Sequence, residues 1–195
     1  MFQKWYDGHK ARVIISDKPE KVEFVTENGV AHLIEQAANR NNLSNVIIIG
    51  HSMGGALAMQ VADNLSRDLK IHSLVTLDPI SQNDCNYGYI TGSILTFGTP
   101  TVGCTTTPSE ITPEMRTNIR SRVSSDNGRW GNVFQSDFNI LHSGDISQAN
   151  FNKRLTFSDS IFESYSSHNL VWYSHETWEI ITTITGMSGF IAPEI

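Results

Sequence analysis

A serine lies where an apolar segment meets an Ala-rich helical pattern. The β-branched run at residues 46–49 is followed by the G-x-S-x-G motif of residues 50–54, and Ser52 is its central residue. Apolar positions with helical spacing continue from Ala56 to Leu65. A strand, a sharp turn and a helix in this order are typical of a nucleophile elbow, whose strained turn exposes the serine hydroxyl. We therefore predict that Ser52 is a nucleophile for acyl transfer.

The residues beside the serine suit this turn. Gly50 and Gly54 have no Cβ atom, so the chain can pass close to itself at both positions. The Met53 amide lies at the start of the following helix, where backbone N–H groups stabilise an anionic oxygen. We expect the Met53 N–H to be one donor of an oxyanion hole.

The elements that must position Ser52 alternate along the chain. We expect strands at 12–16, 46–49, 73–77, 94–97 and 132–135, and helices at 28–40, from the elbow to about Leu65, at 113–120, and after Ser174 as the N-cap. Alternating strands and helices predict an α/β three-layer sandwich with a mostly parallel sheet. At 195 residues the chain, residues 1–195, is expected to form a single domain.

A serine hydroxyl needs a histidine as base and a carboxylate that orients the histidine. In hydrolases with this elbow, the order along the chain is serine, acid, histidine. Asp78 follows the apolar strand at 73–77, 26 residues after Ser52 (78 − 52), at the strand end where functional groups gather in parallel sheets. We predict Asp78 as the acid, with Asp145 and then Asp137 as the alternatives.

Seven histidines are available as the base. Four of them fit poorly, because they precede the serine, lie inside the elbow or lie at the far end of a strand: His9, His32, His51 and His72. His168 lies in the polar segment 164–169, from which a loop histidine can reach the edge of the sheet. We predict His168 as the base. The alternatives are His175, in the first turn of the last helix, and then His142.

The motif GHSMGG at residues 50–55, followed by LVTLDP at residues 74–79, resembles the α/β-hydrolase superfamily, specifically its lipase-like and esterase-like members. In animal neutral lipases the acid also follows the strand after the elbow in a Leu-Asp-Pro context, and this likeness supports Asp78. Small bacterial lipase-like proteins in which a His-Asn or His-Ser pair ends the domain are also similar, which favours His168. The resemblance implies a compact α/β-hydrolase fold.

A competing likeness favours another acid. Residues 95–103 (LTFGTPTVG) are similar to the strand after the elbow in class 3 lipases, and residues 173–178 (YSHETW) are faintly similar to another of their segments. In that pattern Asp145 would be the acid. Its separation from Ser52, 93 residues (145 − 52), is long for that family, so Asp78 remains the prediction.

The region before the elbow lacks a second oxyanion donor of the usual kind. Such a donor often comes from a loop with a His-Gly pair after an early strand, and the turn at residues 6–9 is the only nearby Gly-containing turn. Only 45 residues precede Val46, fewer than a complete hydrolase sheet usually needs. We expect either a minimal fold or a chain that lacks some N-terminal strands.

The charge and hydropathy of the chain limit the kinds of binding partner that we expect. The chain has 14 Lys and Arg against 20 Asp and Glu, a net charge of −6, which argues against nucleic-acid binding and against a polybasic membrane patch. No apolar run approaches the ~20 residues that span a bilayer, and residues 1–10 contain no signal-peptide core. We expect a cytoplasmic protein without membrane insertion. A protein that is secreted by a route without a signal peptide would show the same sequence features.

The two cysteines, Cys85 and Cys104, lie in segments rich in Gly, Thr, Asn and Ser. They indicate two free thiols in loops or, in an oxidising compartment, one disulfide. No C-x-x-C or H-x-x-x-H spacing accompanies them, so no metal site is expected.

Together these patterns predict a serine hydrolase that cleaves an ester of a lipid or a small alcohol and uses no cofactor. Ser52 attacks the carbonyl, His168 transfers protons and Asp78 orients the imidazole. Thioester and peptide substrates stay open, as does an effector phospholipase aimed at another cell. The alternative of a different class is a hydrolase-fold binding protein without turnover. The sequence indicates no oligomeric state.

Overall fold

The computed structural model describes residues 2–5, 11–16, 27–80, 108–124, 129–135, 143–157 and 164–187. Six strands form one sheet in the order of the chain: β1 (Phe2–Trp5), β2 (Ala11–Ser16), β3 (Asn45–His51), β4 (Lys70–Leu77), β5 (Arg129–Gln135) and β6 (Phe151–Leu155). Strand β1 runs antiparallel to β2, and all the other neighbouring strands are parallel.

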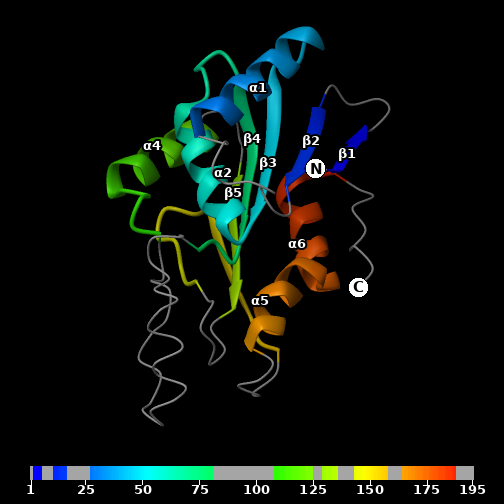
Figure 1. Cartoon of the computed structure of the whole chain (residues 1–195), viewed down its shortest axis with the longest axis vertical. Helices are drawn as coiled ribbons and strands as arrows, with labels where there is room; N and C mark the ends of the chain where they lie inside the picture. Colours follow the sequence, from blue (N-terminus) through cyan, green and yellow to red (C-terminus); the bar gives the residue numbers. More distant parts are fainter. Residues whose placement is uncertain are drawn as a thin grey trace.

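Helices cover both faces of this sheet (Figure 1). The described helices are α1 (Glu27–Arg40), α2 (Met53–Asn64), α4 (Pro113–Ser124), α5 (Ser164–Tyr173) and α6 (His175–Thr185). Helices α1, α2 and α4 pack on one face, and α5 and α6 pack on the other. The predicted three-layer α/β sandwich with a mostly parallel sheet is therefore confirmed.

Each face of the sheet has its own apolar core, which explains why β3 is apolar from Val46 to Ile49. In β3, Ile48 belongs to the core beneath α1, α2 and α4, whereas its neighbours Ile47 and Ile49 belong to the core beneath α5 and α6. Because successive side chains of a strand point to opposite faces, a strand covered on both sides favours a continuous apolar run. In α6, Trp178, Ile181 and Ile184 form a stripe that is buried against the sheet.

Most predicted elements are present with slightly longer bounds. The strands expected at 12–16, 46–49, 73–77 and 132–135 correspond to β2, β3, β4 and β5, and the expected helices correspond to α1, α2, α4 and α6. Strands β1 and β6, at the two ends of the described sheet, were not predicted because their FQKW and FNKRL sequences mix apolar and charged residues. Ser174 is the N-cap of α6, although its side chain makes no capping hydrogen bond.

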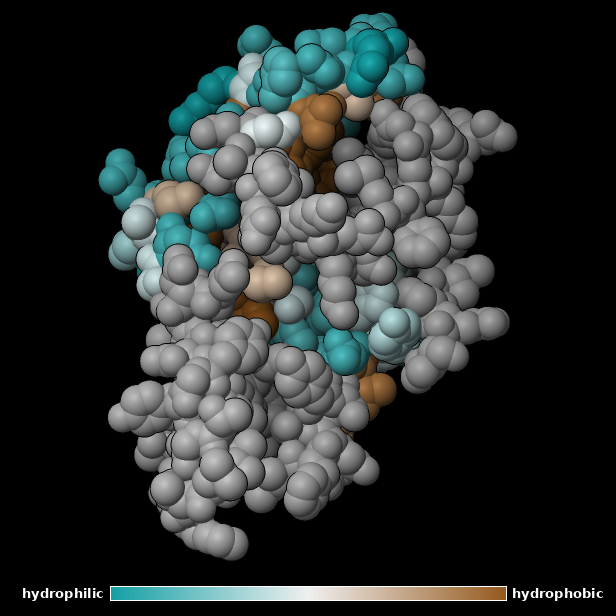
Figure 2. All heavy atoms as spheres, in the orientation of Figure 1, coloured by the Kyte–Doolittle hydropathy of each residue, from teal (hydrophilic) through white to brown (hydrophobic). Residues whose placement is uncertain are grey.

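Several expectations concern residues outside the described ranges. These are the strand at 94–97, the turn at 6–9, and the two cysteines, Cys85 and Cys104. Figure 2 shows hydrophilic residues over the upper end of the molecule, where α1 lies in Figure 1, with smaller hydrophobic areas below them. None of the helices in the described ranges has both the length and the apolar character needed to cross a membrane.

Candidate active site

Ser52 forms the whole turn between β3 and α2. Strand β3 ends at His51 and helix α2 begins at Met53, so a single residue reverses the chain direction. Ser52 has φ 60° and ψ −132°, a conformation that costs a non-glycine residue about 1–3 kcal/mol. Such strain persists only where the surrounding structure enforces it, and residues of this kind concentrate at functional sites.

Three backbone hydrogen bonds enforce this turn. The Ser52 N–H donates to the Leu77 carbonyl at the end of β4 (2.9 Å), and the Ser52 carbonyl accepts from the N–H groups of Gly55 (2.9 Å) and Ile80 (3.2 Å). The serine is thus bound on one side to the end of β4 and on the other to the first turn of α2. These bonds fix the backbone from which its hydroxyl extends.

Gly50 allows α2 to begin this close to β3. A Cβ atom at this position would lie 2.1 Å from the Gly54 carbonyl oxygen and 2.8 Å from the Ala58 Cβ. Both distances are shorter than real Cβ contacts, so no other residue fits without movement of the helix. This is the close approach that was predicted at Gly50.

Asp78 lies at the end of the neighbouring strand and is also conformationally unusual. Its φ is 43°, in the left-handed region that a residue with a Cβ rarely adopts. Its N–H donates to the Val133 carbonyl of β5 (2.7 Å), and its side chain is fully buried. Strands β3 and β4 therefore place two strained residues, Ser52 and Asp78, at the same edge of the sheet.

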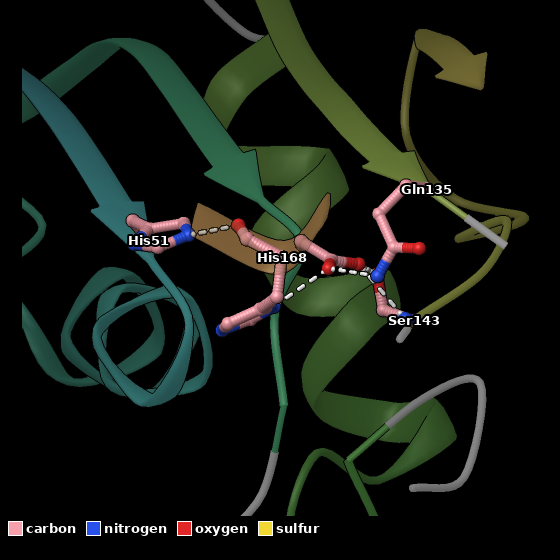
Figure 3. A network of polar contacts seen from close by, with 5 residues as sticks. His51, Gln135, Ser143 and His168 are labelled. Atoms are coloured by element: carbon pink, nitrogen blue, oxygen red, sulfur yellow. Dashed lines mark hydrogen bonds and ion pairs between the residues drawn. The ribbon is translucent and has the colours of Figure 1, made fainter. Parts of the chain in front are cut away.

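The Asp78 carboxylate accepts four hydrogen bonds (Figure 3). Oδ2 accepts from His168 Nδ1 (2.7 Å) and from Gln135 Nε2 (2.8 Å). Oδ1 accepts from the N–H and the hydroxyl of Ser143, both at 2.8 Å. A carboxylate offers about four acceptor positions, so donors occupy all of them.

His168 lies on helix α5 and not in a loop, which corrects the sequence prediction for 164–169. The polar residues of this segment have modest helix propensity, but Val171 and Trp172 of the same helix are buried in the core beneath α5 and α6. Tertiary packing of such an apolar face outweighs intrinsic propensity. The helix holds His168 with 3% of its surface exposed.

The imidazole of His168 is held from two directions. Its Nδ1 faces Asp78, and its ring stacks on His51 with 4.8 Å between ring centroids. The His51 Nε2–H also donates to the His168 backbone carbonyl (2.9 Å). His51 therefore packs against His168 within the site. Because Ser52 follows His51 directly, this contact brings the elbow and His168 to the same place.

The remaining ring nitrogen of His168 is available for chemistry. Its Nε2 is buried and has no hydrogen-bond partner among the described residues, so no hydrogen bond joins it to the Ser52 hydroxyl. Catalytic hydrogen bonds are often long in the absence of substrate and shorten in the complex. An imidazole with this arrangement can accept a proton at Nε2 while Nδ1–H remains bonded to the carboxylate.

The alternative residues lie apart from this network. His175 is the first residue of α6, its side chain is 84% exposed, and its Nε2 lies 3.3 Å from Glu179 Oε1. Asp145 is exposed and bonds to no histidine within the described ranges. His142 and Asp137 lie outside those ranges.

Sequence reasoning missed Gln135 and Ser143. Gln135 is the last residue of β5, so the rule that selected Asp78, a polar residue at the carboxyl end of a parallel strand, would also have found it. Ser143 lies in an irregular segment before β6 and has no local pattern that marks it. Its role becomes visible only through its contact with Asp78.

Met53 is the first residue of α2, at the position where the backbone N–H groups of a helix have no partner within the helix. Negative charge is stabilised at such a position. In the described part of the chain, no three His, Cys, Asp or Glu side chains lie close enough to bind a metal ion.

Comparison with known proteins agrees with this architecture. Residues 15–96 match the family model described as the alpha/beta hydrolase fold. The matched region contains β3, the Ser52 turn, α2, β4 and Asp78. No curated protein matches the chain.

Proposed function

Because this chain carries the alpha/beta hydrolase fold, we propose that it is a serine hydrolase that cleaves carboxylic esters. The observation that carries the proposal is the buried pair of His168 and Asp78, whose Nδ1 and Oδ2 atoms are 2.7 Å apart. The carboxylate fixes the proton on Nδ1, which leaves Nε2 as the base. The strained turn at Ser52 supplies a hydroxyl at the same edge of the sheet.

In the proposed reaction, the Ser52 oxygen attacks the ester carbonyl while His168 Nε2 accepts the hydroxyl proton. The imidazolium that forms is stabilised by Asp78 and then gives its proton to the leaving alcohol. A water molecule attacks the acyl-enzyme and loses a proton to Nε2; the tetrahedral intermediate then releases the acid as His168 gives that proton to the Ser52 oxygen. His168 returns to its starting protonation state, so no cofactor is consumed.

The oxyanion of each tetrahedral intermediate would lie against the start of α2. The Met53 N–H is the donor that the elbow places there, and one donor of this kind contributes about 10²- to 10³-fold to turnover. The α2 dipole adds positive potential at the same point. The Asp78 contacts lie on the opposite side of His168 from Nε2, so they leave this space for the substrate.

The test is labelling with a fluorophosphonate probe, which reacts with an activated serine. We expect the wild-type protein to be labelled at Ser52, as mapped by peptide mass, and Ser52→Ala to be unlabelled. An unlabelled wild-type protein with native unfolding behaviour would overturn the enzyme proposal in favour of a hydrolase-fold binding protein. Labelling that persists in Ser52→Ala would overturn the assignment of the nucleophile.

The base is tested by a matched pair of histidine variants. We expect His168→Ala to lose hydrolysis of p-nitrophenyl esters and His175→Ala to retain it, because of these two histidines only His168 contacts Asp78. The opposite result would make His175 the base. A series of acyl lengths, with thioester and phospholipid substrates in the same panel, then identifies the substrate class.

A further inference from the structure

The orientation of Asp78 is set by residues that sequence reasoning did not identify. A carboxylate at the end of a strand can rotate about its Cα–Cβ and Cβ–Cγ bonds, and only some rotamers reach His168 Nδ1. In this structure the donors on Oδ1 are both from Ser143, and one of the two donors on Oδ2 is Gln135. Any rotation of the carboxylate would break several of these bonds together.

Gln135 acts on the same oxygen that binds His168. Its side chain is fully buried, and Nε2 donates to Asp78 Oδ2 at 2.8 Å. A buried amide that loses its acceptor has no water to replace it, so its loss is costly. Gln135 therefore opposes movement of Oδ2 away from His168.

Ser143 acts on the other oxygen, and its own position is fixed by side chains of β5 and β6. Asn132 of β5 donates from Nδ2 to the Gly144 carbonyl and to Asn152 Oδ1, both at 2.9 Å. Asn152 in turn accepts from the Ile146 N–H (2.9 Å) and donates to the Ile146 carbonyl (3.0 Å). These bonds hold the irregular segment against β5 and β6, so that both donors of Ser143 face Asp78.

We propose that Ser143 and Gln135 are positioning residues that hold the Asp78 carboxylate in the orientation that serves His168. The proposal rests on the proposed function, because it assigns a role within the same site. Neither residue touches the substrate; each acts through Asp78. Their contribution is therefore expected in kcat, where the charge on His168 develops, and not in substrate binding.

The first test compares Ser143→Ala with Ser147→Ala. Ser147 is an exposed serine of the same segment, and its hydroxyl bonds only to Gln148 among the described residues, so its loss is the matched control. We expect Ser143→Ala to lower kcat about tenfold or more, because hydrogen bonds to charged groups are the strong ones, with KM changed less than about twofold. Ser143→Cys, which keeps the shape and a weak donor, should fall between Ala and wild type. Ser147→Ala should match wild type.

The second test asks whether Ser143 acts through Asp78. In an Asp78→Asn background there is no carboxylate to orient, so adding Ser143→Ala should lower the fluorophosphonate labelling rate by less than about twofold. A merely structural role would lower the rate by the same factor in both backgrounds. Equal factors, or a wild-type kcat in Ser143→Ala, would overturn the proposal.

A readout that needs no turnover separates this inference from the proposed function. The low-field proton resonance of an imidazole N–H bonded to a carboxylate reports the His168–Asp78 contact directly. We expect the resonance to shift or broaden in Ser143→Ala and in Gln135→Met, and to be unchanged in Ser147→Ala. Failure of wild type to react with probe or ester overturns the proposed function alone, whereas an unchanged resonance in Ser143→Ala and Gln135→Met overturns the positioning role.

Discussion

Replacing Asp78 by Asn puts an NH₂ group into a site where every neighbour donates. If the NH₂ group takes the place of Oδ1, it faces the Ser143 backbone N–H, a donor that cannot turn away. If the NH₂ group takes the place of Oδ2, Gln135 can turn its amide so that its oxygen faces that group. His168 can then carry its proton on Nε2, so that Nδ1 accepts a hydrogen bond from the NH₂ group. Of the two arrangements, only the second avoids two donors facing each other at Asp78. The structure therefore predicts that Asp78→Asn selects the wrong tautomer of His168.

The expected loss of kcat in Asp78→Asn follows from that tautomer. With its proton on Nε2, His168 cannot accept the proton of Ser52. The same exchange in a serine protease triad lowers kcat by about 10⁴-fold. This corresponds to about 5 kcal/mol of lost transition-state stabilisation at 1.36 kcal/mol per factor of ten. The free energy of unfolding should change far less, by about 1 kcal/mol, because this arrangement leaves no two donors facing each other at Asp78.

The assay combines ester hydrolysis, urea unfolding and the ¹⁵N chemical shifts of the His168 ring, which identify the tautomer. Asp145→Asn is the matched control, since Asp145 is exposed and was the alternative acid. We expect wild-type turnover in that variant. If Asp78→Asn instead keeps turnover within about tenfold of wild type, with its fold intact, the assignment of Asp78 as the acid is wrong.

Two further predictions concern stability and are measured by urea unfolding. Gly50→Ala should lower the free energy of unfolding by about 3 kcal/mol or more, because its Cβ would lie 2.1 Å from the Gly54 carbonyl oxygen. Gly186→Ala, at φ 67° with no atom within 4 Å of the new Cβ, should lower it by about 1 kcal/mol. Equal losses in the two variants would contradict the steric argument. Arg122 donates three hydrogen bonds to carbonyl oxygens at the C-terminal end of α2, and burial, followed by the nearby Arg67, lowers its pKa below the usual value. Arg122→Leu leaves these carbonyls without that donor and should cost about 3 kcal/mol, so an unchanged unfolding midpoint would refute this role.

The parts of the site that could be predicted from the sequence are those determined locally. The elbow depends on residues within a few positions of Ser52, and the apolar run before it is long enough to mark a central strand. Asp78 was predicted by the same logic, since the end of β4 is visible in the sequence as the end of an apolar run. In each case the physical requirement, a missing Cβ or a strand end, lies within the segment itself.

The prediction that His168 lies in a loop was wrong for the opposite reason, because the structure of this segment depends on distant residues. The segment 164–169 contains three serines, a histidine and an asparagine, all with modest helix propensity, so it resembles a loop when considered alone. Helix α5 forms because Val171 and Trp172 pack against a sheet whose strands lie far away in the sequence. Strand β6 was not predicted for a related reason. Its charged residues suit a strand at the end of the described sheet, but its sequence lacks the alternation of apolar and polar residues that marks a strand.

Ser143 shows how far the support of one carboxylate extends beyond any local pattern. Strand β6 pairs with β5 in a register that places Asn152 opposite Asn132. That register lets Asn132 bond to both Asn152 and Gly144, and only then do the two donors of Ser143 face Asp78. A register shift of one residue would turn the side chain of Asn152 to the other face of the sheet and would release the segment. The pairing of β5 with β6, which carries none of the proposed triad, therefore determines whether the acid of that triad is correctly oriented.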